Sequence, residues 1–220
     1  MDRTKEIVNK IGSISGRYSS REVFQDWVRI MAMSISNSVQ LVHNKVWEDR
    51  ERVYVETIKK YDTKEVTVIL ECFNMLLETL EYNKRDVLGE IYMSTNQGNK
   101  ATGQFFTPFN ISLMTASLIL DSIAPDEKGF LRINEPSCGG GGMIIACASV
   151  LENKNVNYQK VLKVVCQDLD YISVFMTYVQ LSLLGIQAIV VQGDTLIEPF
   201  DNKTEASHIF YTPAERGLLI

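Results

Sequence analysis

The sequence is short of the residue types that build disulfides, metal sites and membrane spans. Its 220 residues include four cysteines, which form no Cys-x-x-Cys pair, and two histidines that lie far from them along the chain. We therefore expect reduced thiols and no metal site. No apolar run approaches the roughly 18 residues that cross a bilayer, and the N-terminus lacks the apolar core of a signal peptide. These absences predict a cytoplasmic protein with no membrane partner.

Positive charge is also scarce. The chain has 22 Lys and Arg against 27 Asp and Glu, a net charge of −5, and no dense basic block. A protein that binds nucleic acid unaided usually carries a basic face. Composition therefore argues against autonomous DNA binding, although scattered basic residues could still gather on one face after folding. The length allows one substantial domain or two small ones.

A glycine-rich stretch after the middle of the chain organises the sequence. A short apolar run ending at Ile133 predicts a buried strand, and four consecutive glycines, Gly139 to Gly142, follow it. An apolar run over 143–151 then predicts a helix. Strand, glycine turn and helix together bring bare backbone N–H groups up to a nucleotide-like ligand. A Cβ would block that approach, and we expect several of these glycines to adopt positive φ.

The residues around the glycines favour a cationic ligand over a phosphate. A phosphate-binding P-loop needs Lys followed by Ser or Thr, whereas Met143 and Ile144 stand here. Glu135 lies at the mouth of the turn, where it would repel a pyrophosphate and attract an ammonium group. S-adenosylmethionine (SAM) carries an ammonium group and a sulfonium. The alternative is a glycine-rich surface turn in a structural βα unit.

The first hundred residues predict a helical bundle. Residues 1–20 are polar, and we expect a frayed start there. Ser19 offers an N-cap with Glu22 three residues later. Apolar residues at helical spacing then predict helices over about 20–38, 47–60, 64–81 and 86–93. Their aromatic and methionine stripes are interpreted as core rather than as cofactor contacts.

A polar loop with a boundary near residue 98 precedes the segment Gly-Gln-Phe-Phe-Thr-Pro at 103–108. Thr107 is placed as an N-cap and Pro108 as the first residue of an apolar helix over 109–122. The N-terminus of that helix would favour a carboxylate ligand. The plain alternative is a capped helix start with no ligand.

Two further predicted strands also end in acidic residues. The strand 161–166 leads to Asp168, which could accept hydrogen bonds from ribose hydroxyls, and the strand 188–191 leads to Asp194, which could accept from an adenine amino group. Each Asp alone is more often a helix cap, but three such strand ends point at one crevice. A fourth short strand is predicted at 208–211. The turn after it is where we would look for chemistry, although it holds no obvious catalytic group.

With these segments the chain resembles the adenine-N6 DNA methyltransferases of type I restriction-modification systems. The similarity lies in the segments 103–108, 135–143, 168–170 and 193–196, with a helical lead-in at 86–92. It implies an α/β fold, in which an N-terminal helical bundle (1–98) precedes a partial Rossmann-like SAM-dependent methyltransferase domain (99–220) that is incomplete at its C-terminus.

The resemblance also implies SAM as the cofactor and assigns residues to it. The methionine end of SAM would contact Gln104, Phe106, Thr107 and Pro108. The amino-acid moiety would lie against Glu135, Pro136, Cys138, Gly139, Gly140, Gly141 and Gly142. Asp168 would hold the ribose and Asp194 the adenine amino group.

The sequence departs from this family at the catalytic segment. The family carries Asn-Pro-Pro followed by Tyr or Phe after its fourth strand, where the Asn and a backbone carbonyl accept hydrogen bonds from the target amine and the aromatic ring stacks on the flipped base. No such tetrapeptide occurs here, and the nearest segment, 211–214, lacks both the Asn and the closing aromatic residue. No catalytic residue is therefore predicted.

Three functions stay open on this basis. The first is a type I adenine-N6 DNA methyltransferase, incomplete or partner-dependent, that reaches DNA through partner subunits. The second is a catalytically inactive SAM-binding or scaffold protein of a modification complex. The third is a helical interaction protein whose βα portion is only structural. Because the last strand leaves an open sheet edge, we expect self-association or docking onto a specificity or second methylase subunit.

Overall fold

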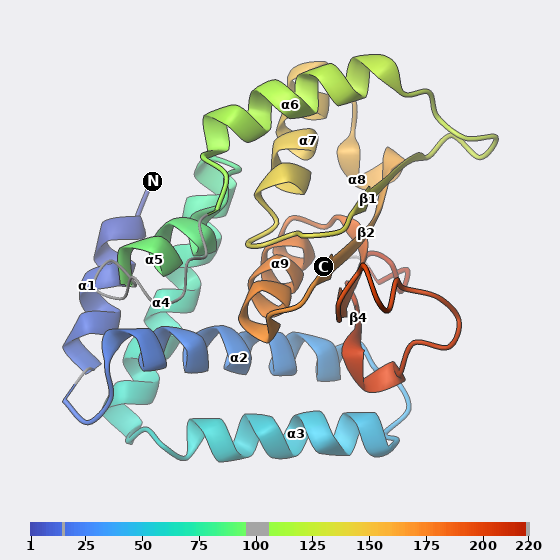
Figure 1. Ribbon diagram of the computed structural model, residues 1–220. Helices are drawn as coiled ribbons and strands as arrows, with labels where there is room; N and C mark the ends of the chain where they lie inside the picture. Colours follow the sequence, from blue (N-terminus) through green and yellow to red (C-terminus); the bar gives the residue numbers. More distant parts are fainter. Residues whose placement is uncertain (15, 96–105, 219–220) are drawn as a thin grey trace.

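The structure, a computed structural model, describes residues 1–14, 16–95 and 106–218 (Figure 1). The helices described before residue 96 are α1 (Thr4–Ile14), α2 (Ser20–Ser38), α3 (Lys45–Ile58), α4 (Thr63–Tyr82) and α5 (Val87–Thr95). After residue 105 come α6 (Phe109–Ser122), β1 (Leu131–Glu135), α7 (Gly142–Asn153), α8 (Tyr158–Val161), β2 (Leu162–Asp168), α9 (Tyr171–Leu183), β3 (Gln187–Gln192) and β4 (Ile209–Tyr211). The mixed α/β fold class is confirmed.

The N-terminal helices follow the apolar spacing, with one correction. Ser19 and Glu22 form a reciprocal capping box at the start of α2, as the sequence predicts. The frayed start expected over residues 1–20 is wrong, because residues 4–14 form α1. Ile7, Ile11 and Ile14 are buried at spacings of four and three residues. That stripe anchors the helix despite its polar surroundings.

A four-stranded sheet carries the second half of the chain, in the order β1-β2-β3-β4. The first three strands are parallel, and β4 runs antiparallel to β3. The chain reverses after β3 through the segment 193–208, so the turn after β4 lies at the amino end of β3, where Thr212 N donates to Ala188 O at 3.0 Å. The turn where we would look for chemistry therefore lies at the opposite end of the sheet from the carboxyl ends of β1, β2 and β3.

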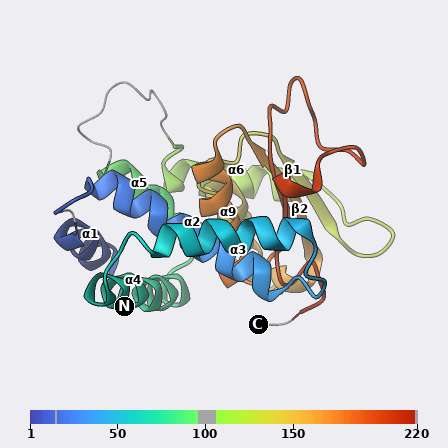
Figure 2. The ribbon, with the colours of Figure 1, turned by 90° about the horizontal axis from the view of Figure 1, so that it is seen from below.

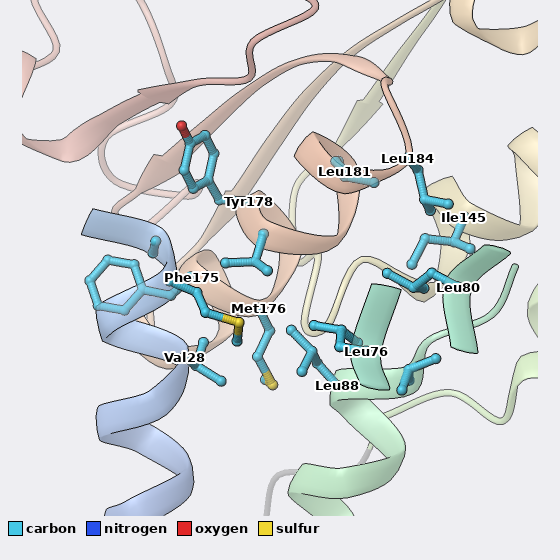
Figure 3. Packing of buried hydrophobic residues seen from close by; sticks show 14 of the residues in the cluster. Val28, Leu76, Leu80, Leu88, Ile145, Phe175, Met176, Tyr178, Leu181 and Leu184 are labelled. Carbon is cyan, nitrogen blue, oxygen red and sulfur yellow. The ribbon is translucent and has the colours of Figure 1, made fainter. Parts of the chain in front are cut away.

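Helix α9 joins the sheet to the N-terminal helices. Every residue from Ile172 to Ser182 is buried, which is typical of a helix surrounded by protein. Its side chains pack on β2 and β3 and also face α2 and α5. In Figure 3, Met176 lies near Val28 of α2 and Leu88 of α5. The two predicted domains therefore share one hydrophobic core, while their expected boundary at 98/99 lies outside the described residues.

Helix α3 lies beside α2 (Figure 2) and reaches the sheet through Arg50. The guanidinium donates to Ile209 O at 2.8 Å and to Ser36 Oγ at 2.7 Å, and it stacks 4.2 Å above the ring centre of Phe210. The last strand is thus covered from within the chain. Of the helices in the described segments, none combines the length and apolarity that a bilayer crossing requires.

Candidate functional site

The carboxyl ends of β1, β2 and β3 meet at one edge of the sheet, as the strand pattern predicts. Hydrogen bonds tie the segments that follow these strands together. Gly139 N donates to Asp168 Oδ2 at 2.8 Å, which joins the ends of β1 and β2. Thr195 Oγ1, after β3, donates to Pro136 O at 2.7 Å. The three strand ends therefore form one connected rim.

The glycine loop, Gly139 to Gly142, requires glycine for two reasons, which are positive φ and the lack of space for a Cβ. Gly139 and Gly141 have φ of +53° and +89°, a region that side chains disfavour. A Cβ on Gly139 would also lie 2.9 Å from a ring carbon of Phe106. Gly140 has no such φ, but a Cβ there would lie 2.6 Å from a carboxylate oxygen of Asp86. Positive φ is thus confirmed for two of the four glycines, and Gly140 is needed for close approach.

A hollow of about 140 Å³ lies against this loop, and we call it the glycine hollow. The predicted site residues that line it are Phe106, Thr107, Glu135, Cys138, Gly139, Gly140 and Gly142. Segments far apart in sequence therefore converge as the sequence analysis expects.

Other predicted residues lie around the glycine hollow rather than in its wall. Asp168 touches the loop through Gly139, and Pro108 lines an adjoining larger hollow of about 760 Å³. Pro136 is exposed, and Gly141 is buried behind the loop. Gln104 lies outside the described residues.

Asp194 takes part in its own turn. Its Oδ1 accepts from Leu196 N at 2.9 Å, which is the local pattern typical of an Asx turn. The carboxylate is half-buried at the end of β3. Among the described residues it is joined to the glycine hollow only indirectly, through Thr195 and Pro136.

Two of the acidic residues at the rim are unusual electrostatically. Burial raises the pKa of Glu135, and the nearby charge of Asp168 raises it further. Burial also raises the pKa of Asp168, against the hydrogen bonds it accepts from Asp170 and Gly139. Two half-buried carboxylates near each other favour a cation between or beside them. This matches the sequence-based preference for a cationic ligand.

The helix N-termini at the hollow differ from the others. Helices α2, α3, α4 and α9 begin with side-chain caps from Ser19, Asn44, Asp62 and Asp170. Helices α6 and α7 begin with Pro108 and Gly141 and have no side-chain cap. The predicted Thr107 cap is therefore wrong by one residue, because Pro108 takes the cap position and cannot supply a side-chain acceptor. The backbone N–H groups of both helices are left for a ligand carboxylate.

Sequence reasoning missed the residues that support the loop from behind. Thr177 Oγ1 donates to Gly139 O at 2.9 Å, and Gln180 Nε2 donates to Gly140 O at 2.7 Å and to Asp86 Oδ1 at 2.8 Å. A usable signal was present, since Thr177 and Gln180 lie three residues apart in the largely apolar α9. Asp86 had been assigned only to the start of a short helix.

The profile of the family described as N-6 DNA methylase matches residues 83–213, which include Asp86, the glycine loop and all three strand ends. The chain belongs to the N-6 DNA methylase family. A solved structure of similar shape is described as a class I S-adenosylmethionine-dependent methyltransferase from Listeria monocytogenes. It shares 11% identity, with a TM-score of 0.46, over 97% of this chain and 68% of that chain.

In this member of the N-6 DNA methylase family, the segment nearest to the family's catalytic tetrapeptide is not at the glycine hollow. Residues 211–214 begin at the end of β4, and Thr212 Oγ1 donates to Ile186 O at 2.7 Å. This contact holds the segment at the amino end of β3, whereas the glycine hollow lies beyond the carboxyl ends of the parallel strands. The segment therefore has a structural role in the sheet.

Proposed function

We propose that the chain is the SAM-binding part of a type I adenine-N6 DNA methyltransferase that depends on partner subunits for DNA recognition. One observation carries this proposal. Helices α6 and α7, which lack side-chain caps, begin beside a hollow that the half-buried Glu135 lines, with the half-buried Asp168 at its rim. Such a hollow suits a ligand that carries both a carboxylate and a cationic centre.

The groups of SAM match the surroundings of the glycine hollow. Its α-carboxylate suits the N-termini of α6 and α7, and its ammonium suits Glu135. Asp168 ends β2 and Asp194 follows β3, where ribose and adenine would extend. When bound, SAM supplies an electrophilic methyl group on its sulfonium. The residues here would bind and orient it and exclude water from it.

A second candidate is a catalytically inactive SAM-binding protein of a modification complex. A specific observation favours it: the chain contains no Asn-Pro-Pro-aromatic segment, and residues 211–214 are fixed at the amino end of β3. No group in the described residues takes the place of that Asn beside the glycine hollow. Methyl transfer by this chain would therefore require a residue supplied from elsewhere.

Two experiments separate these functions. Titration calorimetry of the purified chain with SAM tests cofactor binding, and we expect heat release and a raised melting temperature. Absence of both would leave only the structural interaction protein. Transfer of labelled methyl groups from SAM to DNA is then measured with and without candidate specificity and methylase subunits. Transfer that appears only with a partner supports the partner-dependent enzyme, and none in either case supports the inactive protein.

A further inference from the structure

Asp86 connects the N-terminal helices to the glycine loop. It precedes α5, is 6% exposed and lines the glycine hollow. Its Oδ1 accepts from Gly89 N at 2.8 Å and from Gln180 Nε2 at 2.8 Å. Gln180 in turn donates to Gly140 O and accepts from Leu88 N at 3.1 Å. A single polar network thus links α5, α9 and the cofactor loop.

The cap at α5 does not explain why this residue is an acid. Asn caps a helix as well as Asp and brings no ionised group. Burial raises the pKa of Asp86, and the charge of Glu90 adds to the shift. The neighbouring Arg85 is paired with Glu90 and Asp2 at 2.9 and 2.8 Å. A buried carboxylate without a cation is expensive to hold in a folded protein.

Both carboxylate oxygens of Asp86 face the glycine loop, but they differ in their hydrogen bonds. In the described part of the chain, no hydrogen bond ends on Oδ2 and no Lys, Arg or His forms an ion pair with Asp86. Oδ1 and Oδ2 lie 2.5 and 2.6 Å from the position that a Cβ on Gly140 would occupy. The fold therefore places an unpaired acceptor at the wall of a hollow that already holds Glu135.

We propose that Asp86 is a specificity-determining residue whose carboxylate pairs with the ammonium group of the bound ligand. This inference rests on the proposed function, because it assigns one end of the SAM molecule. Asp86 and Glu135 then select nucleosides that carry a cationic amino-acid tail over nucleosides that lack it. The ligand supplies the positive charge that the described residues do not.

The test compares two ligands that differ in that tail. S-adenosylhomocysteine has the ammonium group, and 5′-methylthioadenosine lacks the amino-acid portion. Calorimetry gives Kd for both with the wild-type chain and with Asp86→Asn, which keeps the shape and the cap acceptor. We expect Asp86→Asn to weaken S-adenosylhomocysteine binding by about tenfold or more, to leave 5′-methylthioadenosine binding within about twofold, and to leave the ligand-free melting temperature equal or higher.

Asp26→Asn is the matched control. Asp26 is also a buried acid of the N-terminal helices, but it forms ion pairs with basic side chains of the protein. It pairs with Arg29 at 2.7 Å and Lys60 at 2.9 Å. This variant should lower the melting temperature and leave the ratio of the two Kd values unchanged.

Two results would overturn the role of Asp86: unchanged S-adenosylhomocysteine binding in Asp86→Asn, or an equal loss for both ligands with a lower melting temperature. A wild-type chain that binds neither ligand would instead refute the proposed function itself.

Discussion

At the scale of single residues, Gly139 shows how the loop and the cofactor segment depend on each other. Its φ of +53° excludes most side chains, and the ring of Phe106 occupies the space where a Cβ would stand. Phe106 is held in turn against Tyr92 of α5, with ring centres 5.2 Å apart. The glycine loop is therefore shaped by a tilted aromatic pair as well as by its own backbone.

Replacing Gly139 by alanine should damage the site more than the fold. Left-handed backbone costs an L residue roughly 1–2 kcal/mol, and the new methyl group would displace Phe106. We expect a stability loss of that size, measured by urea unfolding, and a loss of SAM affinity of about tenfold or more in calorimetry.

Gly129→Ala provides the comparison for this prediction. Gly129 has φ of +83° with open space around its Cβ position, so this variant should show the stability loss alone. Equal SAM affinity in the two alanine variants would contradict the role given to Phe106.

For Glu135 and Asp168 at the rim, a change of pH should have opposite effects on the stability of the fold and on the affinity for SAM. The pKa values of Glu135 and Asp168 are raised, so their contribution to folding is full at low pH and is lost as pH rises through the raised values. Binding a cation needs the ionised forms. Between about pH 8 and pH 5, above the usual range of exposed carboxylates, lowering the pH should therefore weaken SAM binding while the ligand-free protein gains stability from these two groups.

Glu135→Gln tests the assignment of this pH dependence. The variant should bind SAM more weakly at pH 8 and show a flatter change of Kd between about pH 8 and pH 5. Calorimetry at several pH values in buffers of equal ionic strength measures both quantities. A wild-type Kd that does not change over this range would count against ionised rim carboxylates as ligand contacts.

At the scale of elements, the features that could be predicted from the sequence are those formed by residues close together in the chain. Ser19 and Glu22 predict their capping box because the partners lie three residues apart. Asp168 could be placed at the rim because the carboxyl ends of neighbouring parallel strands meet at one edge of a sheet. Asp86 was misjudged because its burial and its contact with Gln180, 94 residues away, arise only on folding. The reversal of β4 was missed because three residues carry no signal of direction.

Arg50 determines how helix α3 is held on the sheet. Replacing it by alanine would leave the carbonyl of Ile209 buried and without its donor, which costs about 1–3 kcal/mol. We expect a loss of that size in the free energy of unfolding, measured with urea. Arg52→Ala, two residues away on the same helix, removes an exposed pair with Asp49 and should change stability by less than about 0.5 kcal/mol. Equal losses in the free energy of unfolding for the two substitutions would show that Arg50 does not hold α3 on the sheet.

At the scale of the whole molecule, the two edges of the sheet are unequal. The edge at β4, which the sequence suggested would stay open, is covered by Arg50 and α3. The other edge belongs to β1, which pairs only with β2 in the described sheet. Its residues Arg132 and Asn134 are exposed. We therefore expect a partner at the first strand, immediately before the glycine loop, and not at the last.

This edge gives a prediction for the assembly of the molecule. An unpaired parallel strand is a template for another chain, so we expect the isolated protein to self-associate with rising concentration in light scattering. Asn134→Lys places a charge on the edge strand and should shift the molecules toward monomer, while Asn110→Lys on the exposed surface of α6 should not. Because β1 leads directly into Glu135, a partner bound there would contact the rim of the glycine hollow. A wild-type chain that stays monomeric at all concentrations, with ordinary thermal stability, would contradict self-association through β1.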